Sequence, residues 1–156
     1  MSKAFTLLET LFSLLIMDTA IIGVFSLMQQ VAGAEPLSGE RLISSYLGQE
    51  GIEIVRNIRD VNKLKKLSWD QGLTACASGC QADYLSQTLS PWTGAYLLNS
   101  GSFYNYSSGS VSKYQRKITI VVQGLPTDTL KVNVEIFWSE KNRSHSLKIQ
   151  ENLYKW

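Results

Sequence analysis

The residue most able to take part in specific chemistry is Glu9, an acid near the start of a long apolar run. The run extends from Phe5 to Val31, and Asp18 is the only other charged residue within it. A carboxylate inside a membrane costs roughly 2.5–3.5 kcal/mol on insertion scales, so a residue of this kind usually faces a partner. If the chain is cut before Phe5, the new α-amine lies one helical turn from Glu9. That amine, in the same chain or in a neighbouring copy, is then the natural partner of the acid.

Two further interpretations of these acids stay open. Glu9 also suits a plain membrane anchor, because an acid near a helix N-terminus interacts favourably with the helix dipole. Asp18 lies nine residues beyond Glu9, which is about 13 Å further along a helix. Its short side chain cannot reach the membrane surface as lysine or arginine can. We expect Asp18 either to be protonated in the membrane or to be paired within an assembly.

The two cysteines, Cys76 and Cys80, enclose Ala-Ser-Gly. Two cysteines without nearby histidines cannot complete a four-ligand zinc site, and the C-x-x-C redox spacing is not met. We therefore predict no metal site. In an exported domain a small local disulfide between Cys76 and Cys80 is favoured over free thiols.

Motifs of the common catalytic classes are not found. His145 is the single histidine, and the sequence has no P-loop, no dinucleotide-binding glycine motif and no G-x-S-x-G elbow. The net charge is +2, and the longest basic block is Lys65-Lys66. The sequence therefore lacks the cluster of basic residues that nucleic-acid binding usually requires. We expect a protein that is not an enzyme, with no catalytic residues, no cofactor and no nucleic-acid partner.

The apolar run predicts a membrane-spanning helix. At about 1.5 Å per residue, Phe5–Met28 is long enough to cross a hydrocarbon core of roughly 30 Å. A secretory signal would carry its small-residue cleavage site beyond the apolar region. Here the small-residue junction is Ala4, on the near side, so cleavage would leave the helix on the mature protein. Lys3 favours a cytoplasmic N-terminus, with the rest of the chain outside the membrane.

A family resemblance rests on these residues. The segment Lys3-Ala4-Phe5-Thr6-Leu7-Leu8-Glu9 resembles the cleavage-and-methylation signature of type IV prepilins and pseudopilins. The resemblance implies that a prepilin peptidase cuts between Ala4 and Phe5 and that the Phe5 amine is then methylated. It also implies that Glu9 guides each subunit into a helical filament with other copies or homologous pilins. Ala4 in place of the commoner glycine is a departure from the pattern.

Four segments follow from these patterns: a leader (1–4), an assembly helix (5–34), an amphipathic helix (35–64) and a globular head (65–156). Glu35-Pro36 is expected to interrupt the helix, because proline removes a donor and disfavours helix at the preceding residue. Beyond it, apolar residues recur at helical spacing from Ile43 to Val61 and form one face. The segment from Gly48 to Asp60 also resembles the post-anchor helix of minor-pilin-like proteins.

The last third of the chain carries the clearest strand pattern. Apolar residues alternate over 118–122 and 132–138, and a third strand begins near Leu147. Short strands are predicted over 96–98 and 103–106. The fold class is therefore α+β: a long N-terminal helix whose second half lies on an antiparallel sheet, which agrees with a type IV pilin-like layout. The sheet needs a cover for its apolar face, and the helix offers the matching stripe.

The aromatic residues of the middle segment have two interpretations. They are Tyr96, Phe103, Tyr104 and Tyr106. Such residues can bind a sugar or stack a base, but they more often form cross-strand pairs on a sheet.

The expected function is a major or minor structural subunit of a type IV pilus-like filament. It would be held in the cytoplasmic (inner) membrane as a single-pass precursor and reach a cell-surface filament on assembly. One alternative is a minor pseudopilin of a type II secretion or DNA-uptake system. The other, from a different class, is a membrane-anchored extracellular binding module with the aromatic segment as its ligand surface.

Overall fold

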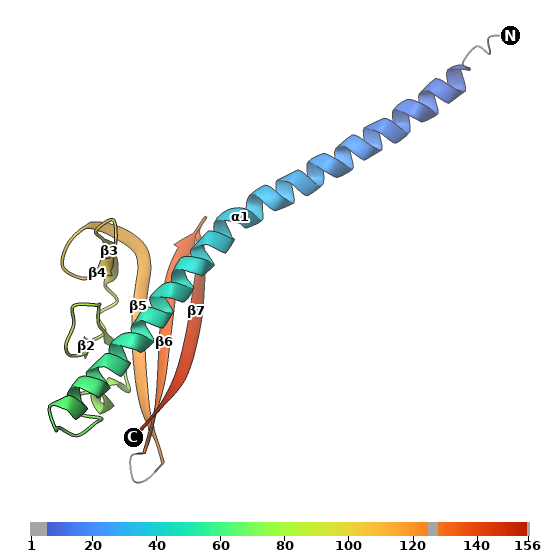
Figure 1. Ribbon diagram of the computed structural model, residues 1–156. Helices are drawn as coiled ribbons and strands as arrows, with labels where there is room; N and C mark the ends of the chain where they lie inside the picture. The colour runs from blue at the N-terminus through green and yellow to red at the C-terminus, as the bar shows by residue number, and fades with distance from the viewer. Residues whose placement is uncertain (1–5, 125–127, 156) are drawn as a thin grey trace. The chain divides into compact units, whose positions relative to one another are not determined.

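The computed structural model describes residues 6–124 and 128–155 of the 156-residue chain, and for residues 32–37 it describes the backbone alone. The chain divides into two compact units, residues 1–40 and residues 41–156. The first unit is helical where it is described. The second combines a helical segment with an antiparallel sheet, so the fold class is α+β, as predicted (Figure 1).

The helix α1 extends from Leu7 to Leu64. The predicted interruption at Glu35-Pro36 is wrong for the backbone, which is helical through both residues. The physical reason is that an interior proline removes a single amide donor and can bend a helix without ending it. The helix ends after Leu64 instead, where Lys66 adopts a left-handed backbone conformation with φ 58°.

The second unit contains a seven-stranded antiparallel sheet. Three long strands form a meander in the order β5, β6, β7, and the short strands β1 and β3 pair along the other side of β5. β2 pairs with β1, and β4 pairs with β3. The strands are β1 (Cys80–Gln81), β2 (Ser90–Pro91), β3 (Tyr96–Asn99), β4 (Tyr104–Asn105), β5 (Ser110–Gln123), β6 (Thr129–Glu140) and β7 (Arg143–Tyr154). The predicted meander and both short strands are confirmed.

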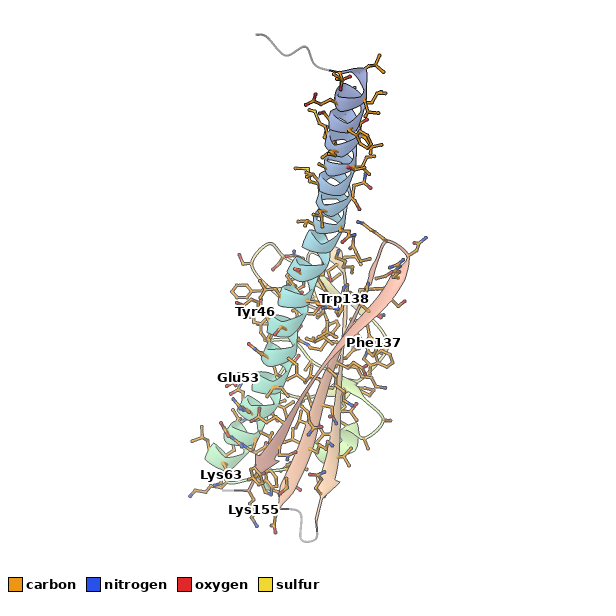
Figure 2. All side chains as sticks on the ribbon, turned by 90° about the vertical axis from the view of Figure 1, so that its right-hand side faces the viewer. Tyr46, Glu53, Lys63, Phe137, Trp138 and Lys155 are labelled. Atoms are coloured by element: carbon orange, nitrogen blue, oxygen red, sulfur yellow. A yellow bond between two sulfur atoms is a disulfide. The ribbon has the colours of Figure 1, made fainter. Side chains whose placement is uncertain are left out.

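The core lies between the sheet and the part of α1 that belongs to the second unit. Alternate residues of β6 point into it, and Leu130, Val132, Val134 and Ile136 are completely buried. Figure 2 shows the helix lying along one face of the long strands. The predicted apolar stripe of the helix is confirmed from Leu47 to Ile58, and it also includes Ile52 and Val55. An apolar sheet face and an amphipathic helix thus cover each other, as the two patterns require.

A local disulfide closes the loop between the helix and the sheet. Cys76 and Cys80 are paired, with their Cα atoms 5.3 Å apart, and both residues are buried. Gly79 lies inside this small ring with φ +116°, a conformation that side chains rarely adopt. Trp69 is buried just before the ring and belongs to the same core.

Close packing of the helix on the sheet predicts a large effect of the variant Gly51→Ala. The added Cβ would lie 2.7 Å from Cγ1 of Val134 and 3.1 Å from Cδ of Arg116. Val134 is a stiff β-branched residue in the middle of β6, so the helix must move away. We expect the free energy of unfolding to fall by about 1–3 kcal/mol, the usual cost of overpacking. Urea titration of the full chain in detergent micelles, followed by tryptophan fluorescence, measures this change.

The matched control is Gly39→Ala, because nothing lies within 4 Å of its added Cβ. Alanine is favoured over glycine in a helix by up to about 1 kcal/mol. This variant should be at least as stable as the wild type. Equal stability of the Gly51→Ala and Gly39→Ala chains would contradict the proposed close contact.

Candidate functional site

The first candidate site is the apolar span Leu7–Val31. This helix is long and apolar enough to cross a membrane. Its large side chains are exposed around the whole circumference, with Leu8 at 66%, Phe12 at 57% and Phe25 at 62% of full exposure. A helix that is apolar on every side is stable only when lipid or other helices surround it. The span is therefore the part of the molecule that most clearly requires a partner.

The hydroxyls of Thr10, Ser13 and Thr19 and the backbone amide of Glu9 make local hydrogen bonds. The amide of Glu9 donates to the carbonyl oxygen of Thr6 at 3.1 Å, and the Ser13 hydroxyl donates to the Glu9 carbonyl oxygen at 2.8 Å. The hydroxyls of Thr10 and Thr19 also donate to carbonyl oxygens of the preceding turn. These contacts shield the three hydroxyls from an apolar environment, and Glu9 and Asp18 are the charged residues of the span.

The carboxylates of Glu9 and Asp18 have no hydrogen-bond or ion-pair partner among the described residues of the span. Nine residues correspond to two and a half helical turns, so the two acids lie on opposite faces of the helix. A neighbouring helix that packs on the face carrying Glu9 therefore cannot also contact Asp18, which lies on the opposite face of this helix. Ala4 and Phe5, the predicted cleavage and methylation residues, lie outside the described residues.

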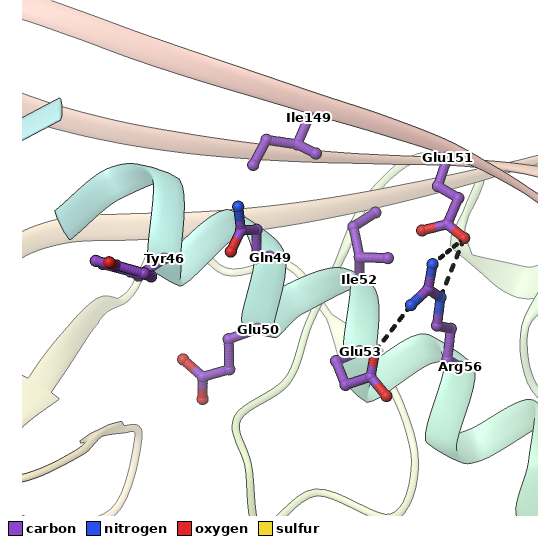
Figure 3. A pocket seen from close by; sticks show the side chains of 8 residues that line it. All are labelled: Tyr46, Gln49, Glu50, Ile52, Glu53, Arg56, Ile149 and Glu151. Carbon is purple, nitrogen blue, oxygen red and sulfur yellow. Dashed lines mark hydrogen bonds and ion pairs between the residues drawn. The ribbon is translucent and has the colours of Figure 1, made fainter. Parts of the chain in front are cut away.

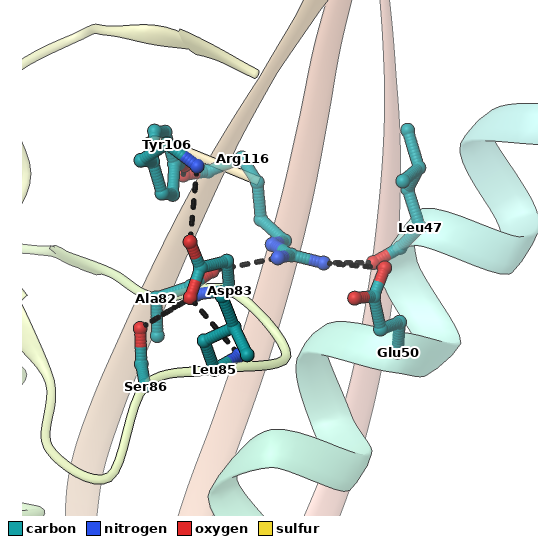
Figure 4. Close-up of polar contacts among 8 residues, drawn as sticks. All are labelled: Leu47, Glu50, Ala82, Asp83, Leu85, Ser86, Tyr106 and Arg116. Carbon is teal, nitrogen blue, oxygen red and sulfur yellow. Dashed lines mark hydrogen bonds and ion pairs between the residues drawn. The ribbon is translucent and has the colours of Figure 1, made fainter. Parts of the chain in front are cut away.

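The second notable site is a buried arginine in the head. Arg116 is completely buried, and its guanidinium donates to the carbonyl oxygens of Leu47 at 3.1 Å and Ala82 at 2.6 Å. It also donates to the Glu50 carboxylate at 3.1 Å, and the Glu50 side chain is 31% exposed. Figure 4 shows that these partners come from the helix and from the loop after β1. One side chain from β5 thus ties together three parts of the head.

Asp83 extends this polar network. Its carboxylate accepts hydrogen bonds from the amides of Tyr106 at 2.9 Å and Leu85 at 3.2 Å, and from the Ser86 hydroxyl at 2.7 Å (Figure 4). Burial acts to raise the pKa of Asp83, but these hydrogen bonds and the nearby Arg116 charge outweigh it, so the pKa lies below its ordinary value. The pKa of the Tyr106 phenol is raised because the group is buried. Neither the Asp83 carboxylate nor the Tyr106 phenol is therefore poised to exchange a proton near neutral pH.

This environment makes the stability of the head depend on acid pH. The folded pKa of Asp83 is lowered from about 3.8, so the stabilisation is present above that pH and is lost as the pH falls through the lower folded value. We expect the free energy of unfolding to decrease below about pH 4 more steeply in the wild type than in Asp83→Asn. Urea titrations at neutral pH and at about pH 3 compare the two chains. Identical losses on acidification would show that other carboxylates carry the effect.

A groove runs between the exposed side of α1 and the edge strand β7. Its volume is about 510 Å³, and Tyr46, Glu53 and Ile149 are among its lining residues (Figure 3). Arg56 crosses it, paired with Glu151 through two guanidinium nitrogens and with Glu53 at 3.1 Å. The pKa of Arg56 is raised chiefly by the hydrogen bond to Glu151. The groove therefore holds an ion-paired arginine that joins the helix to β7, rather than a reactive group.

The predicted aromatic cluster does not stay together. Tyr104 and Tyr106 are partly buried against the core, and Tyr104 makes an edge-to-face contact with Tyr114 at 5.8 Å. Phe103 and Tyr96 remain exposed, but they line different hollows. Period-two alternation and a bulge between Tyr96 and Leu98 cause this division. The expectation that these aromatic residues pack within the sheet therefore holds for Tyr104 and Tyr106.

The remaining candidates show no catalytic arrangement. His145 stacks on Trp138 with ring centroids 5.4 Å apart. Within residues 6–124 and 128–155, no group of three or more His, Cys, Asp or Glu side chains is placed to hold a metal ion. Sequence reasoning missed Arg116, although alternation along the strand places it on the same face as the buried Ile118 and Ile120 and so gave a signal for its burial. Comparison with protein-family models, curated proteins and solved structures finds no match to this chain.

Proposed function

We propose that this chain is a structural subunit of a type IV pilus-like filament, inserted in the cytoplasmic membrane as a precursor and assembled through its N-terminal helix. The observation that carries the proposal is the apolar span Leu7–Val31, exposed on all sides, with Glu9 near its start. Such a helix suits a lipid environment before assembly and a core of neighbouring helices after it. The head, a helix on an antiparallel sheet, is compatible with a pilin-like fold.

In this proposal the chemistry is that of assembly rather than catalysis. A prepilin peptidase removes residues 1–4, and the Phe5 amine is methylated. Van der Waals packing between apolar helices supplies most of the attraction, as in membrane helix association. The Glu9 carboxylate pairs with the Phe5 amine of a neighbouring copy. Pairing chiefly relieves the penalty of a buried charge, so Glu9 sets the register of one subunit against the next more than it adds affinity.

Mass spectrometry of the mature protein tests the proposal most directly. The protein is purified from membranes of a host that expresses a prepilin peptidase. We expect a chain that starts at Phe5 and carries a methyl group on its amine. The control is a host without the peptidase, where the N-terminus should be unprocessed. A chain that still begins at Met1 in both hosts, or one that is cut elsewhere, overturns the proposal of a filament subunit. Either result favours the alternative function of a membrane-anchored binding module.

A minor pseudopilin of a secretion or DNA-uptake system would share this processing. The two assignments differ in abundance within the fibre, since a minor subunit is present in few copies. Quantitative mass spectrometry of sheared fibres therefore separates a major subunit from a minor one.

A further inference from the structure

An aromatic hollow lies on the face of the sheet that points away from the core. Alternation along β6 puts Trp138 on the core side and Phe137 on the outer side (Figure 2). The neighbouring outer residues of β6 are polar: Lys131, Asn133, Glu135 and Ser139. A phenylalanine among them is not explained by the hydrophobic core, which lies behind the sheet.

Two further aromatic residues surround Phe137. Trp92, which follows β2, lies 6.2 Å from Phe137 between ring centroids. Tyr96 at the start of β3 is 50% exposed. Together they line a hollow of about 270 Å³ whose walls also include Gln115 and Ser139, and Trp138 and His145 contribute to its lining from the neighbouring positions of β6 and β7. This is somewhat smaller than the roughly 300–1,000 Å³ of pockets for drug-sized ligands, and it suits a single ring of a longer molecule.

The Trp92 side chain also carries a donor that no acceptor in the described part of the chain satisfies. The indole Nε1 of Trp92 is buried and has no hydrogen-bond partner among the described residues. A buried N–H group without a partner is costly, and most are satisfied by an acceptor. Packing of Trp92 on Phe137 explains why the ring is held against the sheet. It does not explain the unpaired indole donor or the exposed Tyr96 ring.

The charges around the hollow limit the kind of ligand. The Lys117 ammonium lies 4.8 Å from the Trp92 ring centroid, so a cationic ligand would meet a like charge. Lys113 in the wall is paired with Glu140 at 2.6 Å, so of these two lysines Lys117 alone offers its charge to a phosphate. A nucleic acid would need such charge, because phosphate neutralisation dominates its affinity. The ligand that fits best is neutral, with one flat apolar face and several hydroxyl groups.

We propose that this hollow, formed by Trp92, Tyr96 and Phe137, binds one sugar ring of a neutral polysaccharide. The C–H face of the ring would lie on the aromatic side chains, which combine large apolar area with polar edges. The ring hydroxyls would exchange hydrogen bonds with Gln115 and Ser139, which line the same hollow. This inference does not depend on the filament proposal, since it applies equally to an anchored binding module.

The test uses the full chain in detergent micelles with three neutral probes: maltohexaose, cellohexaose and hexa-N-acetylchitohexaose. Binding is followed by tryptophan fluorescence and by isothermal titration calorimetry. We expect at least one probe to bind saturably, with an affinity that falls about tenfold or more in Tyr96→Ala, the effect of losing roughly 1.4 kcal/mol. Trp92→Phe keeps an aromatic face in the wall of the hollow, so it should bind the probe more tightly than Trp92→Ala.

Phe103→Ala is the matched control, because Phe103 is an exposed aromatic residue that does not line this hollow. It should bind the probe as the wild type does. The proposal is overturned if none of the three probes binds to the folded chain, or if Phe103→Ala weakens binding as much as Tyr96→Ala. It is also overturned if a single-stranded oligothymidine binds through Tyr96 while the sugars do not. None of these outcomes would affect the mass expected of the mature N-terminus.

Discussion

Replacement of Glu9 by glutamine is expected to abolish filament formation or to reduce it to a small fraction of the wild-type level. In the proposed assembly the Glu9 carboxylate neutralises the α-amine of a neighbouring Phe5 within an apolar core. Removing one partner leaves the other charge buried without compensation, which is strongly unfavourable. We expect the association constant per subunit to fall by about a hundredfold or more, the change produced by roughly 3 kcal/mol. Electron microscopy of sheared fibres, with immunoblotting of the fibre and membrane fractions, measures this loss.

Two variants make the test specific. Glu9→Asp keeps the charge on a shorter side chain and should restore part of the assembly. Ser13→Ala removes a hydroxyl from the next turn of the same helix, and that hydroxyl bonds only within the helix, so it should assemble normally. The variant chains should all reach the membrane, because none of the substitutions adds a charge to the apolar span Leu7–Val31. Normal fibre number and length in Glu9→Gln would rule out the proposed role of the acid.

Replacement of Arg116 by leucine is expected to destabilise the head strongly, and more than Gly51→Ala does. The guanidinium is completely buried and satisfies two carbonyl oxygens and the Glu50 carboxylate. Leucine leaves all three acceptors without this donor. Breaking a buried pair in this way typically lowers the free energy of unfolding by about 3–5 kcal/mol. Since domains are stable by only about 5–15 kcal/mol, this loss would remove a large part of the stability of the head.

Arg56→Leu provides the matched comparison. Arg56 also joins the helix to the sheet, but its side chain is 41% exposed and its ion pairs face solvent. Exposed pairs contribute about 0–1 kcal/mol, so this variant should remain close to the wild type. Arg116→Lys, which keeps the charge but not the planar fork, should lie between the two. Urea titration followed by tryptophan fluorescence ranks the variants, and equal losses for Arg116→Leu and Arg56→Leu would contradict the importance of the buried contacts.

These two predictions concern different parts of the molecule and have different readouts. The Glu9 variants should change assembly without changing the stability of the head, because Glu9 lies in the first unit and the core lies in the second. The Arg116 variants should change stability first and assembly only as a consequence. The aromatic hollow forms a third site, and its variants should affect sugar binding while the fibres and the fold remain intact.

Local patterns in the sequence determined much of the architecture. The membrane-length helix, the apolar stripe of the second helical half, the three long strands and the class of fold all follow from apolar periodicity. Periodicity suffices because an apolar face must be covered, and only a few arrangements of one helix and one sheet achieve this. Glu9 was also apparent from the sequence, since an acid in an apolar run is unusual whatever surrounds it.

Tertiary structure alone decided how particular side chains meet. Pro36 predicted a helix end, yet the backbone continues through it, because the loss of one amide donor does not outweigh the surrounding helical residues. Arg116 was not singled out from the sequence, and its burial depends on carbonyl oxygens of Leu47 and Ala82, which are distant in sequence. The hollow at Trp92 likewise depends on a loop folding back over β6. Contacts between distant segments depend on the whole fold, whereas helices and strands carry their signal within a few residues.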